Sequence, residues 1–296
     1  MENDISFDVG AAVPILESRL LSPGSEPTQL SSPAMRIFGV VNASHDSLAK
    51  FSVATSYETA LARGRSLLAE GADAIDIGSQ ASHGDAAMIT PEQEWKDLEG
   101  PLRAVVSLGV DVSVDTWQVE TARWALDAGA TVLNAADALQ NDAMIELAAE
   151  REVPVVLPFM LGPDPRHLKH VDGDPVQVML DWFEIQIERA STYGIRDRLM
   201  LDPGTGFAPP HWNWDDRYHY QKAIYTGLDR LRRFELPIYV PVAWKQSPDR
   251  LELVDIVLGH DVEFARAHLP AQIRARHEAI RAGHALPTTD LLLDIG

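Results

Sequence analysis

Five short apolar stretches of the sequence each end on a polar residue that can hydrogen-bond or carry charge. The residues are Asn42, Asp115, Asn134, Asp202 and Lys245. After Asp202 the chain turns through the two glycines of Pro203-Gly204-Thr205-Gly206. Because the carboxyl ends of the parallel strands meet at one pocket in a β/α barrel, we expect these five side chains to converge at the mouth of such a barrel.

These residue types suit a flat, nitrogen-rich heterocycle. A carboxylate accepts two parallel N–H bonds from an aminopyrimidinone edge, an amide both donates and accepts, and a lysine ammonium reaches a ring carbonyl. Each residue taken alone is equally consistent with an ordinary strand-end group that caps the next helix. Five such residues at the ends of successive apolar stretches favour a ligand site.

The elements that position these residues follow from the apolar pattern. From Met35 onward, short apolar runs alternate with longer amphipathic segments, which is typical of repeated βα units. We predict strands near Arg36–Val41, Ala74–Gly78, Asp111–Asp115, Thr131–Asn134, Val153–Phe159, Arg198–Asp202 and Pro237–Ala243. Helices are expected between them, for example at Ser56–Glu70 and Pro91–Ser107. The regular alternation favours a (β/α)8 TIM barrel over an open sheet.

The eighth strand is the weak point of this prediction. The late apolar candidate is Leu291-Leu292-Leu293-Asp294-Ile295, and no helix can follow it before Gly296. The helix-rich stretch from Arg250 to Arg281 is expected either to cover the gap or to form a dimer face. We therefore predict a barrel that is imperfect at its eighth strand and helix.

Length and composition indicate one barrel-sized domain. The chain has 296 residues, of which 46% are hydrophobic. Residues 1–34, which include a Ser/Pro/Gly stretch, are predicted to be an N-terminal extension and linker, and residues 35–296 the barrel domain. The sequence has no run of about 18 apolar residues, and the early acids Glu2, Asp4 and Asp8 do not fit a secretory signal. We expect a soluble cytoplasmic protein.

Charge and cysteine content exclude several classes of function. The formal net charge is -19 and the sequence has no basic patch, so we expect no nucleic-acid partner and no membrane partner. The chain has no cysteine, which excludes disulfides, thiolate zinc sites and cysteine nucleophiles. A small-molecule ligand remains as the expected partner.

Several segments resemble the successive motifs of the dihydropteroate synthase family, the pterin-binding barrels of the folate pathway. The segments are Phe38-Gly39-Val40-Val41-Asn42-Ala43-Ser44-His45-Asp46-Ser47, Ala69–Gly78, Ser113-Val114-Asp115-Thr116, Asn134 and Asp202–Phe207. They occur in the family's order between Met35 and Lys245. The chain is identified as a divergent member of this family, and the resemblance implies a pterin pocket in a TIM barrel.

The resemblance implies that the pterin edge hydrogen-bonds to Asp115, Asn134 and Asp202. Lys245 would reach the ring oxygen and the N5 side. In the family, 6-hydroxymethyl-7,8-dihydropterin diphosphate loses pyrophosphate, and the amine of p-aminobenzoate captures the methylene. Anionic groups around the ring would stabilise the positive charge that develops during this step. The resemblance also implies a homodimer.

The loops that would hold the diphosphate depart from the family pattern. Asn42 and Asp46 match the first-loop positions associated with Mg²⁺ and the diphosphate, which implies a magnesium requirement. In the second loop, Ser82 is a predicted substrate contact. His83 stands where the family has a diphosphate-binding arginine, so we expect it to act in catalysis together with Asp115 and Lys245. A histidine is a single donor and mostly neutral at neutral pH, and it lacks the planar fork of arginine.

The family's final strand motif, of the form Arg-Val-His-Asp, has no evident counterpart in the sequence. Arg274-Ala275-Arg276-His277 has similar letters but lies in a helical pattern. Near strand seven, the usual Ser-Arg-Lys reads Ala243-Trp244-Lys245, which keeps the lysine and changes its neighbours. Two phosphate-binding elements are therefore expected to be weakened or missing.

Three functions are consistent with these motifs. The first is a dihydropteroate-synthase-like transferase that joins a dihydropterin diphosphate to p-aminobenzoate or a related aryl amine. The second is a non-catalytic pterin-binding paralogue, since loss of the phosphate-binding elements is what such drift would leave. The third is a barrel like the methyltetrahydrofolate methyltransferases, which share the strand-end aspartates and asparagine and need no diphosphate site. The complete set of pterin-binding residues favours the first.

Overall fold

The computed structural model describes residues 35–81, 88–164, 167–207, 209, 211–242 and 247–284. The predictions made for residues 1–34, Ser82, His83, Lys245 and Leu291–Ile295 concern segments outside these residues. The elements in chain order are β1 (Arg36–Asn42), η1 (Lys50–Ser52), α2 (Tyr57–Ala69), β2 (Ala74–Gly78), α3 (Pro91–Val106), β3 (Asp111–Thr116), α4 (Val119–Asp127), β4 (Val132–Ala135), α5 (Asp142–Arg151), β5 (Val155–Pro158), α6 (Pro175–Thr192), η2 (Arg196–Arg198), β6 (Leu199–Asp202), α7 (Trp214–Thr226), η3 (Leu228–Phe234), β7 (Tyr239–Pro241), α8 (Pro248–Leu258), β8 (Phe264–Ala267) and α9 (Pro270–Arg281).

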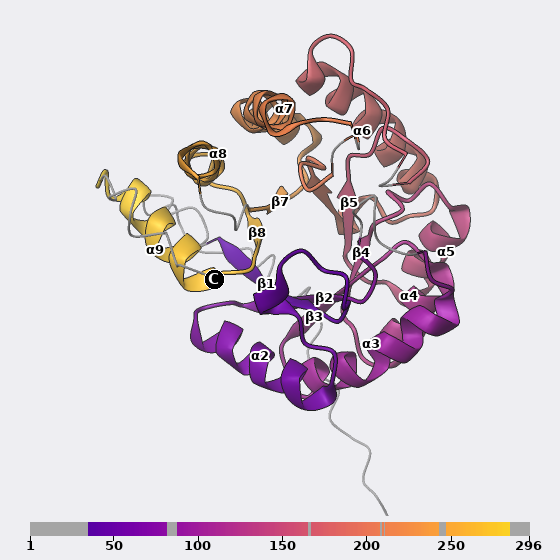
Figure 1. The fold of residues 1–296 in the computed structure, drawn as a ribbon. Helices are drawn as coiled ribbons and strands as arrows, with labels where there is room; N and C mark the ends of the chain where they lie inside the picture. The colour runs from indigo at the N-terminus through magenta and orange to yellow at the C-terminus, as the bar shows by residue number, and fades with distance from the viewer. Residues whose placement is uncertain are drawn as a thin grey trace, which may run out of the picture. The chain divides into compact units, whose positions relative to one another are not determined.

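The eight strands form one parallel sheet that is nearly closed into a barrel. Their order is β6-β5-β4-β3-β2-β1-β8-β7, and an α-helix follows each strand. Figure 1 shows the helices on the outside of the strands. The seam lies between β6 and β7, where an isolated bridge joins Leu201 to Ile238 and the Leu201 N–H donates to the Pro237 carbonyl at 2.8 Å. The predicted (β/α)8 TIM barrel is confirmed, with one incompletely paired seam.

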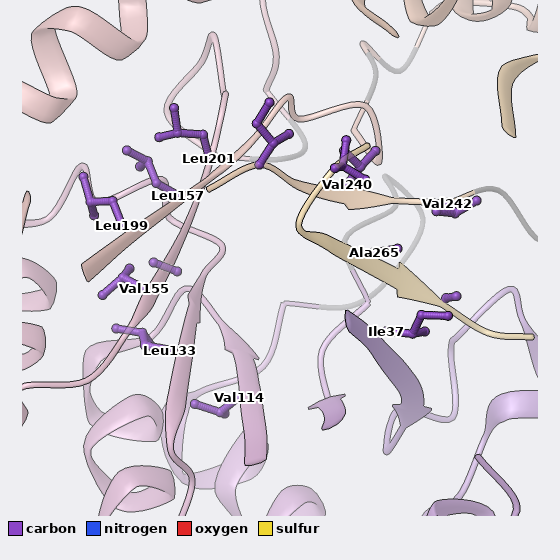
Figure 2. Close-up of a cluster of buried hydrophobic side chains, with 14 of the residues drawn as sticks. Ile37, Val114, Leu133, Val155, Leu157, Leu199, Leu201, Val240, Val242 and Ala265 are labelled. Carbon is purple, nitrogen blue, oxygen red and sulfur yellow. The ribbon is translucent and has the colours of Figure 1, made fainter. Parts of the chain in front are cut away.

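The period-two alternation of the strands separates two apolar clusters. Side chains on one face of each strand pack against the helices. Figure 2 shows part of this outer cluster, with Ile37, Val114, Leu133, Val155, Leu157, Leu199, Leu201, Val240, Val242 and Ala265 labelled. A second cluster takes one side chain from each of seven strands, namely Phe38, Ala74, Val132, Val156, Met200, Tyr239 and Phe264. Because alternate residues of a strand point to opposite faces, this second cluster fills the interior of the barrel.

The seven predicted strands lie where the sequence placed them, but the eighth does not. The eighth strand is β8, which pairs with β1 and with β7, and α9 follows it. The prediction of an eighth strand at Leu291–Ile295 without a following helix was therefore wrong. The stretch from Arg250 to Arg281 does not merely cover a gap, because it contains β8 between two helices. The strand β8 does not stand out as an apolar run because Arg266 interrupts it.

Side-chain caps fix where the helices begin after each strand. Ser56 and Thr59 form a reciprocal capping box at the start of α2. Thr90 caps α3 directly before Pro91, as predicted, and Asn213 accepts a hydrogen bond from the Asp216 N–H at the start of α7. The caps place the first turn of each helix close to the carboxyl end of the preceding strand.

Glu235 offers a test of the backbone conformation that ends η3. It is exposed and has a left-handed φ of 54°, which disfavours side chains with a Cβ. We expect Glu235→Gly to raise the free energy of unfolding by up to about 1 kcal/mol, or roughly 2–4 °C in Tm. Glu146→Gly, at an exposed helical position of α5, is the matched control and should lower stability by about 1 kcal/mol. Equal destabilisation by both variants would show that the left-handed backbone conformation of Glu235 is not strained. Chemical denaturation gives both values.

Candidate functional site

An aromatic floor lies below the mouth of the barrel. The ring of Phe38 makes edge contacts with Tyr239 at 5.3 Å and with Phe264 at 6.0 Å between ring centroids. These rings come from β1, β7 and β8 and belong to the interior cluster. Phe38 and Tyr239 are almost completely buried. The floor fills the lower part of the interior and leaves the carboxyl ends of the strands as the side at which we expect a ligand to enter.

A polar layer lies directly above this floor. On β2, β4, β6 and β8, the residue two positions after the interior apolar residue is polar. These four polar residues are Asp76, Asn134, Asp202 and Arg266. Because the side-chain period of a strand is two, these four polar side chains also point into the interior, one layer nearer the mouth. Asp115 joins them, since it pairs in register with Asn134 across β3 and β4.

Arg266 connects the polar layer. Its Nε donates to Asp76 Oδ2 at 2.6 Å, and its Nη2 donates to Asp115 Oδ2 at 3.1 Å. Asn134 Nδ2 donates to the other oxygen of Asp76 at 3.3 Å. The Asp76 side chain has no exposed surface. One fully buried carboxylate thus fixes both the arginine and the amide of the site.

Arg266 stays positively charged. Burial acts to lower its pKa, but the neighbouring carboxylates of Asp76 and Asp115 outweigh this effect and raise the pKa above its usual value. A buried arginine that is hydrogen-bonded to two acids keeps its proton. The polar layer therefore contains a permanent cation between carboxylates.

Two carboxyl groups of the site titrate near neutrality. Burial, and then the charge of Asp76, raises the pKa of Asp115 to about 7, against the opposing effect of Arg266. Burial also raises the pKa of Asp202 to about 7, although the Gly204 N–H bond opposes the shift. The Asp115 side chain is 31% exposed, so water moderates its shift more than that of Asp202, which is 7% exposed. Both groups can change protonation when a ligand binds.

Two glycines allow the strand ends to approach closely. Gly204 has φ +70° and its N–H donates to Asp202 Oδ1 at 2.8 Å, while a Cβ at this position would lie 2.0 Å from the Phe159 carbonyl oxygen. At the end of β2, a Cβ on Gly78 would lie 2.7 Å from the Asp115 carbonyl oxygen. The glycines therefore hold the two titrating aspartates in place and leave space beside them.

The predicted pterin residues Asp115, Asn134 and Asp202 come together in the mouth. Asp76 and Arg266 were not predicted from the sequence. The signal for Asp76 is a charged residue inside the apolar run Ala74–Gly78, at the same strand parity as the buried Ala74. Lys245, Ser82 and His83 lie outside the described residues, so their predicted roles stay predictions.

Part of the final strand motif is present, contrary to the expectation from the sequence. Arg266-Ala267-His268 stands at the end of β8 in the Arg-x-His order of the family motif, and Leu269 takes the place of its aspartate. The Phe51 ring from the first loop packs edge-on against His268 at 5.7 Å between centroids. Burial, with the charges of Arg266 and Arg63, lowers the pKa of His268 well below its usual value, which keeps the ring neutral. The last strand and the first loop thus meet at one side of the mouth.

The alternative motif at Arg274–His277 lies elsewhere, within α9. Arg274 donates to the Gly71 carbonyl at 2.7 Å and to Asp73 at 2.8 Å. Arg276 is paired with Asp255 of α8. These arginines hold α9 against its neighbours and do not reach the polar layer, so they are not the missing phosphate-binding element.

The first loop is shaped by the side chain of Asn42. Asn42 Nδ2 donates to Ser52 Oγ at 2.6 Å, and Ser52 Oγ donates to the Ala49 carbonyl at 2.7 Å. Asp46 is exposed in the same loop. The described residues contain no group of three or more histidine, aspartate or glutamate side chains close enough to hold a metal ion. An amide and a carboxylate oxygen nevertheless fit Mg²⁺, which usually binds one or two carboxylates together with substrate phosphates and water.

Most of the chain matches the model of one protein family. The family model described as pterin binding enzyme matches residues 38–286. The chain therefore belongs to the pterin-binding enzyme family. The described helices include none that is long and apolar enough to cross a bilayer.

The relatives found within this family are dihydropteroate synthases. The type-2 enzyme of Escherichia coli is 31% identical over 215 residues, which cover 71% of this chain and 76% of that protein. The Xanthomonas albilineans enzyme, solved with 4-aminobenzoic acid, has a TM-score of 0.73 and 27% identity over 87% of this chain and 96% of that one. The Yersinia pestis enzyme, solved with a sulfonamide drug complex, has a TM-score of 0.72 and 26% identity over 84% and 94%.

Removal of the buried charge at Asp202 should stabilise the fold in a pH-dependent way. The folded pKa is raised, so the carboxyl is easier to ionise in the unfolded chain, and the cost to stability grows as pH rises from about 4 to about 7. Asp202→Asn keeps an oxygen acceptor for the Gly204 N–H. We expect the Tm gain of Asp202→Asn over the wild type, measured by scanning calorimetry, to be larger at pH 8 than at pH 5. A gain that shrinks between pH 5 and pH 8 would contradict the raised pKa.

Proposed function

We propose that this protein is a dihydropteroate synthase that condenses 6-hydroxymethyl-7,8-dihydropterin diphosphate with p-aminobenzoate or a related aryl amine. The observation that carries the proposal is the convergence of Asp115, Asn134 and Asp202 above a closed aromatic floor. The matched relatives are dihydropteroate synthases. This favours the synthase over a methyltransferase-like reaction.

The polar layer suits the amino-oxo edge of a pterin. A carboxylate of Asp202 accepts two parallel N–H bonds from the 2-amino-3H edge, while Asn134 both donates and accepts. Asp115 accepts from the opposite part of the ring, and Lys245 reaches the ring oxygen and N5. The aromatic floor gives the flat ring an apolar surface on which to lie.

The chemical step separates charge at the methylene carbon. The bond from this carbon to the diphosphate oxygen breaks, and the electron pair leaves with pyrophosphate. The amine nitrogen of the acceptor forms the new bond and releases a proton. The carboxylates of Asp76, Asp115 and Asp202 exceed the single cation Arg266 among them, so the described polar layer stabilises positive charge on the pterin.

Hydrogen-bond donors and Mg²⁺ would hold the leaving diphosphate. The cation Arg266 and the neutral ring of His268 stand on the side where the first loop meets β8. Ser82 and His83 from the second loop would complete the set of donors. Mg²⁺ bound by Asn42 and Asp46 would neutralise phosphate charge. The presence of the Arg266-Ala267-His268 motif removes one reason to regard the chain as a non-catalytic paralogue. We also propose that the protein works as a homodimer in the cytoplasm.

The direct test is mass spectrometry of dihydropteroate after incubation with the dihydropterin diphosphate, Mg²⁺ and p-aminobenzoate. The wild type should form product with turnover. Asp115→Asn should lower kcat/KM by roughly 100-fold, since it removes a charged acceptor from the pterin. Asp111→Asn is the control. This acid lies at the opposite end of β3 and pairs with Arg36 at 2.9 Å, so turnover should stay within about threefold of wild type.

The variant His83→Ala tests the role of the second loop, which would hold the diphosphate, separately from the role of the pterin site. Turnover should fall while the affinity for the pterin ring stays unchanged, because the variant alters only the second loop. If the wild type binds the dihydropterin diphosphate but forms no product, the chain is a pterin-binding protein without synthase activity. If it does not bind the pterin at all, the assignment of the pocket is wrong.

A further inference from the structure

Arg217 is half-buried, and among the described residues no acid forms an ion pair with it. Its Nε is enclosed and has no hydrogen-bond acceptor in the part of the chain that the structure describes. Acids outnumber lysines and arginines by 44 to 25, yet none of the ion pairs among the described residues includes Arg217. Burial lowers its pKa. A partly buried guanidinium that lacks an acceptor is costly for the folded protein.

The helix geometry shows which way Arg217 faces. Gln221 and Tyr225 follow it at intervals of four residues on α7, which places all three on one side of the helix. Gln221 donates to the Thr205 carbonyl at 2.7 Å, and Tyr225 Oη lies 2.7 Å from Thr205 Oγ1 and donates to the Pro241 carbonyl at 3.2 Å. This side of α7 therefore faces the ends of β6 and β7. Arg217, in the first helical turn, lies on that side nearest the mouth.

A second arginine lies beside it. The guanidinium carbon of Arg250, in the first turn of α8, is 3.5 Å from the ring centre of Trp214. Trp214 precedes Arg217 by three residues on α7, so the ring that Arg250 covers lies on the helix next to Arg217. Burial and the charge of Arg217 also lower the pKa of Arg250. Two arginines at the rim, one of them with no acceptor for its Nε among the described residues, suit the binding of an anion.

We propose that Arg217, supported by Arg250, binds the carboxylate of the aryl amine acceptor. This inference rests on the proposed synthase reaction and names the residue that selects a carboxylated acceptor. Arg217 belongs to α7 and Arg250 to α8, which follow β6 and β7 at the seam of the barrel. Arg266 and the first loop lie at β8 and β1. The acceptor carboxylate and the diphosphate thus have separate cationic partners.

The test compares a charged with a neutral acceptor. For Arg217→Gln we expect the KM for p-aminobenzoate to rise roughly 10- to 100-fold, as for the loss of a charge-assisted hydrogen bond. The KM for p-aminobenzamide, which lacks the charge, and the KM for the dihydropterin diphosphate should stay within about twofold. Arg217→Lys should retain part of the affinity for p-aminobenzoate. Arg233→Gln is the matched control, because Arg233 pairs with Glu184 at 2.7 Å on the outside of the protein.

Calorimetric binding of p-aminobenzoate, without turnover, separates this inference from the proposed function. Weaker binding to Arg217→Gln than to the wild type supports the inference even if no dihydropteroate forms, in which case only the proposed function fails. Equal binding to both proteins, or no binding to the wild type, would overturn the inference. An equal rise in the KM values of the acid and the amide would also overturn it, because the effect would then be structural. Thermal unfolding of Arg217→Gln checks that the variant is folded.

Discussion

The buried contact of Arg266 with Asp76 and Asp115 is the constraint on which the rest of the site depends. Three carboxyl groups inside a barrel would repel one another and would be costly to bury, and one arginine held at 2.6 and 3.1 Å offsets much of that cost. The same arginine belongs to β8, so the charge balance of the site requires the last strand to be in register with β1. The fold and the chemistry of the mouth thus depend on the same ion pairs.

The barrel was largely predictable because its repeating unit leaves a clear pattern. Seven strands stood out as apolar runs, since their outer residues pack under helices and all of them except β3 also place an apolar side chain in the interior cluster. The eighth did not, because Arg266 interrupts the apolar run of Phe264–Ala267. A late apolar segment, Leu291–Ile295, then stood out as the alternative. The misplacement followed from the chemistry of the site, since an inward charge interrupts the hydrophobic pattern that identifies a strand.

The site was predictable where a polar residue ends a strand. Asp115, Asn134 and Asp202 stand at such ends, and the parallel register brings them together. Asp76 lies within a strand, and Arg217 lies in a helix whose inward face is defined only by the packing of Gln221 and Tyr225. The charge of Asp76 inside the apolar run of β2 is a local signal, whereas no local pattern marks Arg217. Their importance follows from what surrounds them, which for Asp76 is two donors and for Arg217 is the lack of an acceptor among the described residues.

The carboxyl groups beside Arg266 decide what the mouth binds. The first experiment is therefore a calorimetric titration of the wild type with 6-hydroxymethyl-7,8-dihydropterin between pH 5.5 and 8.5. Asp115 and Asp202 have pKa values raised to about 7, and the ionised carboxylates accept the N–H groups of the ring more strongly than the protonated carboxyl groups do. The association constant should therefore rise as the pH increases toward 7, by up to roughly tenfold per pH unit for each carboxyl group, and level off above pH 7. An affinity that is constant over this range, or that increases on acidification, would show that ionised carboxyl groups beside Arg266 do not determine the binding of the pterin.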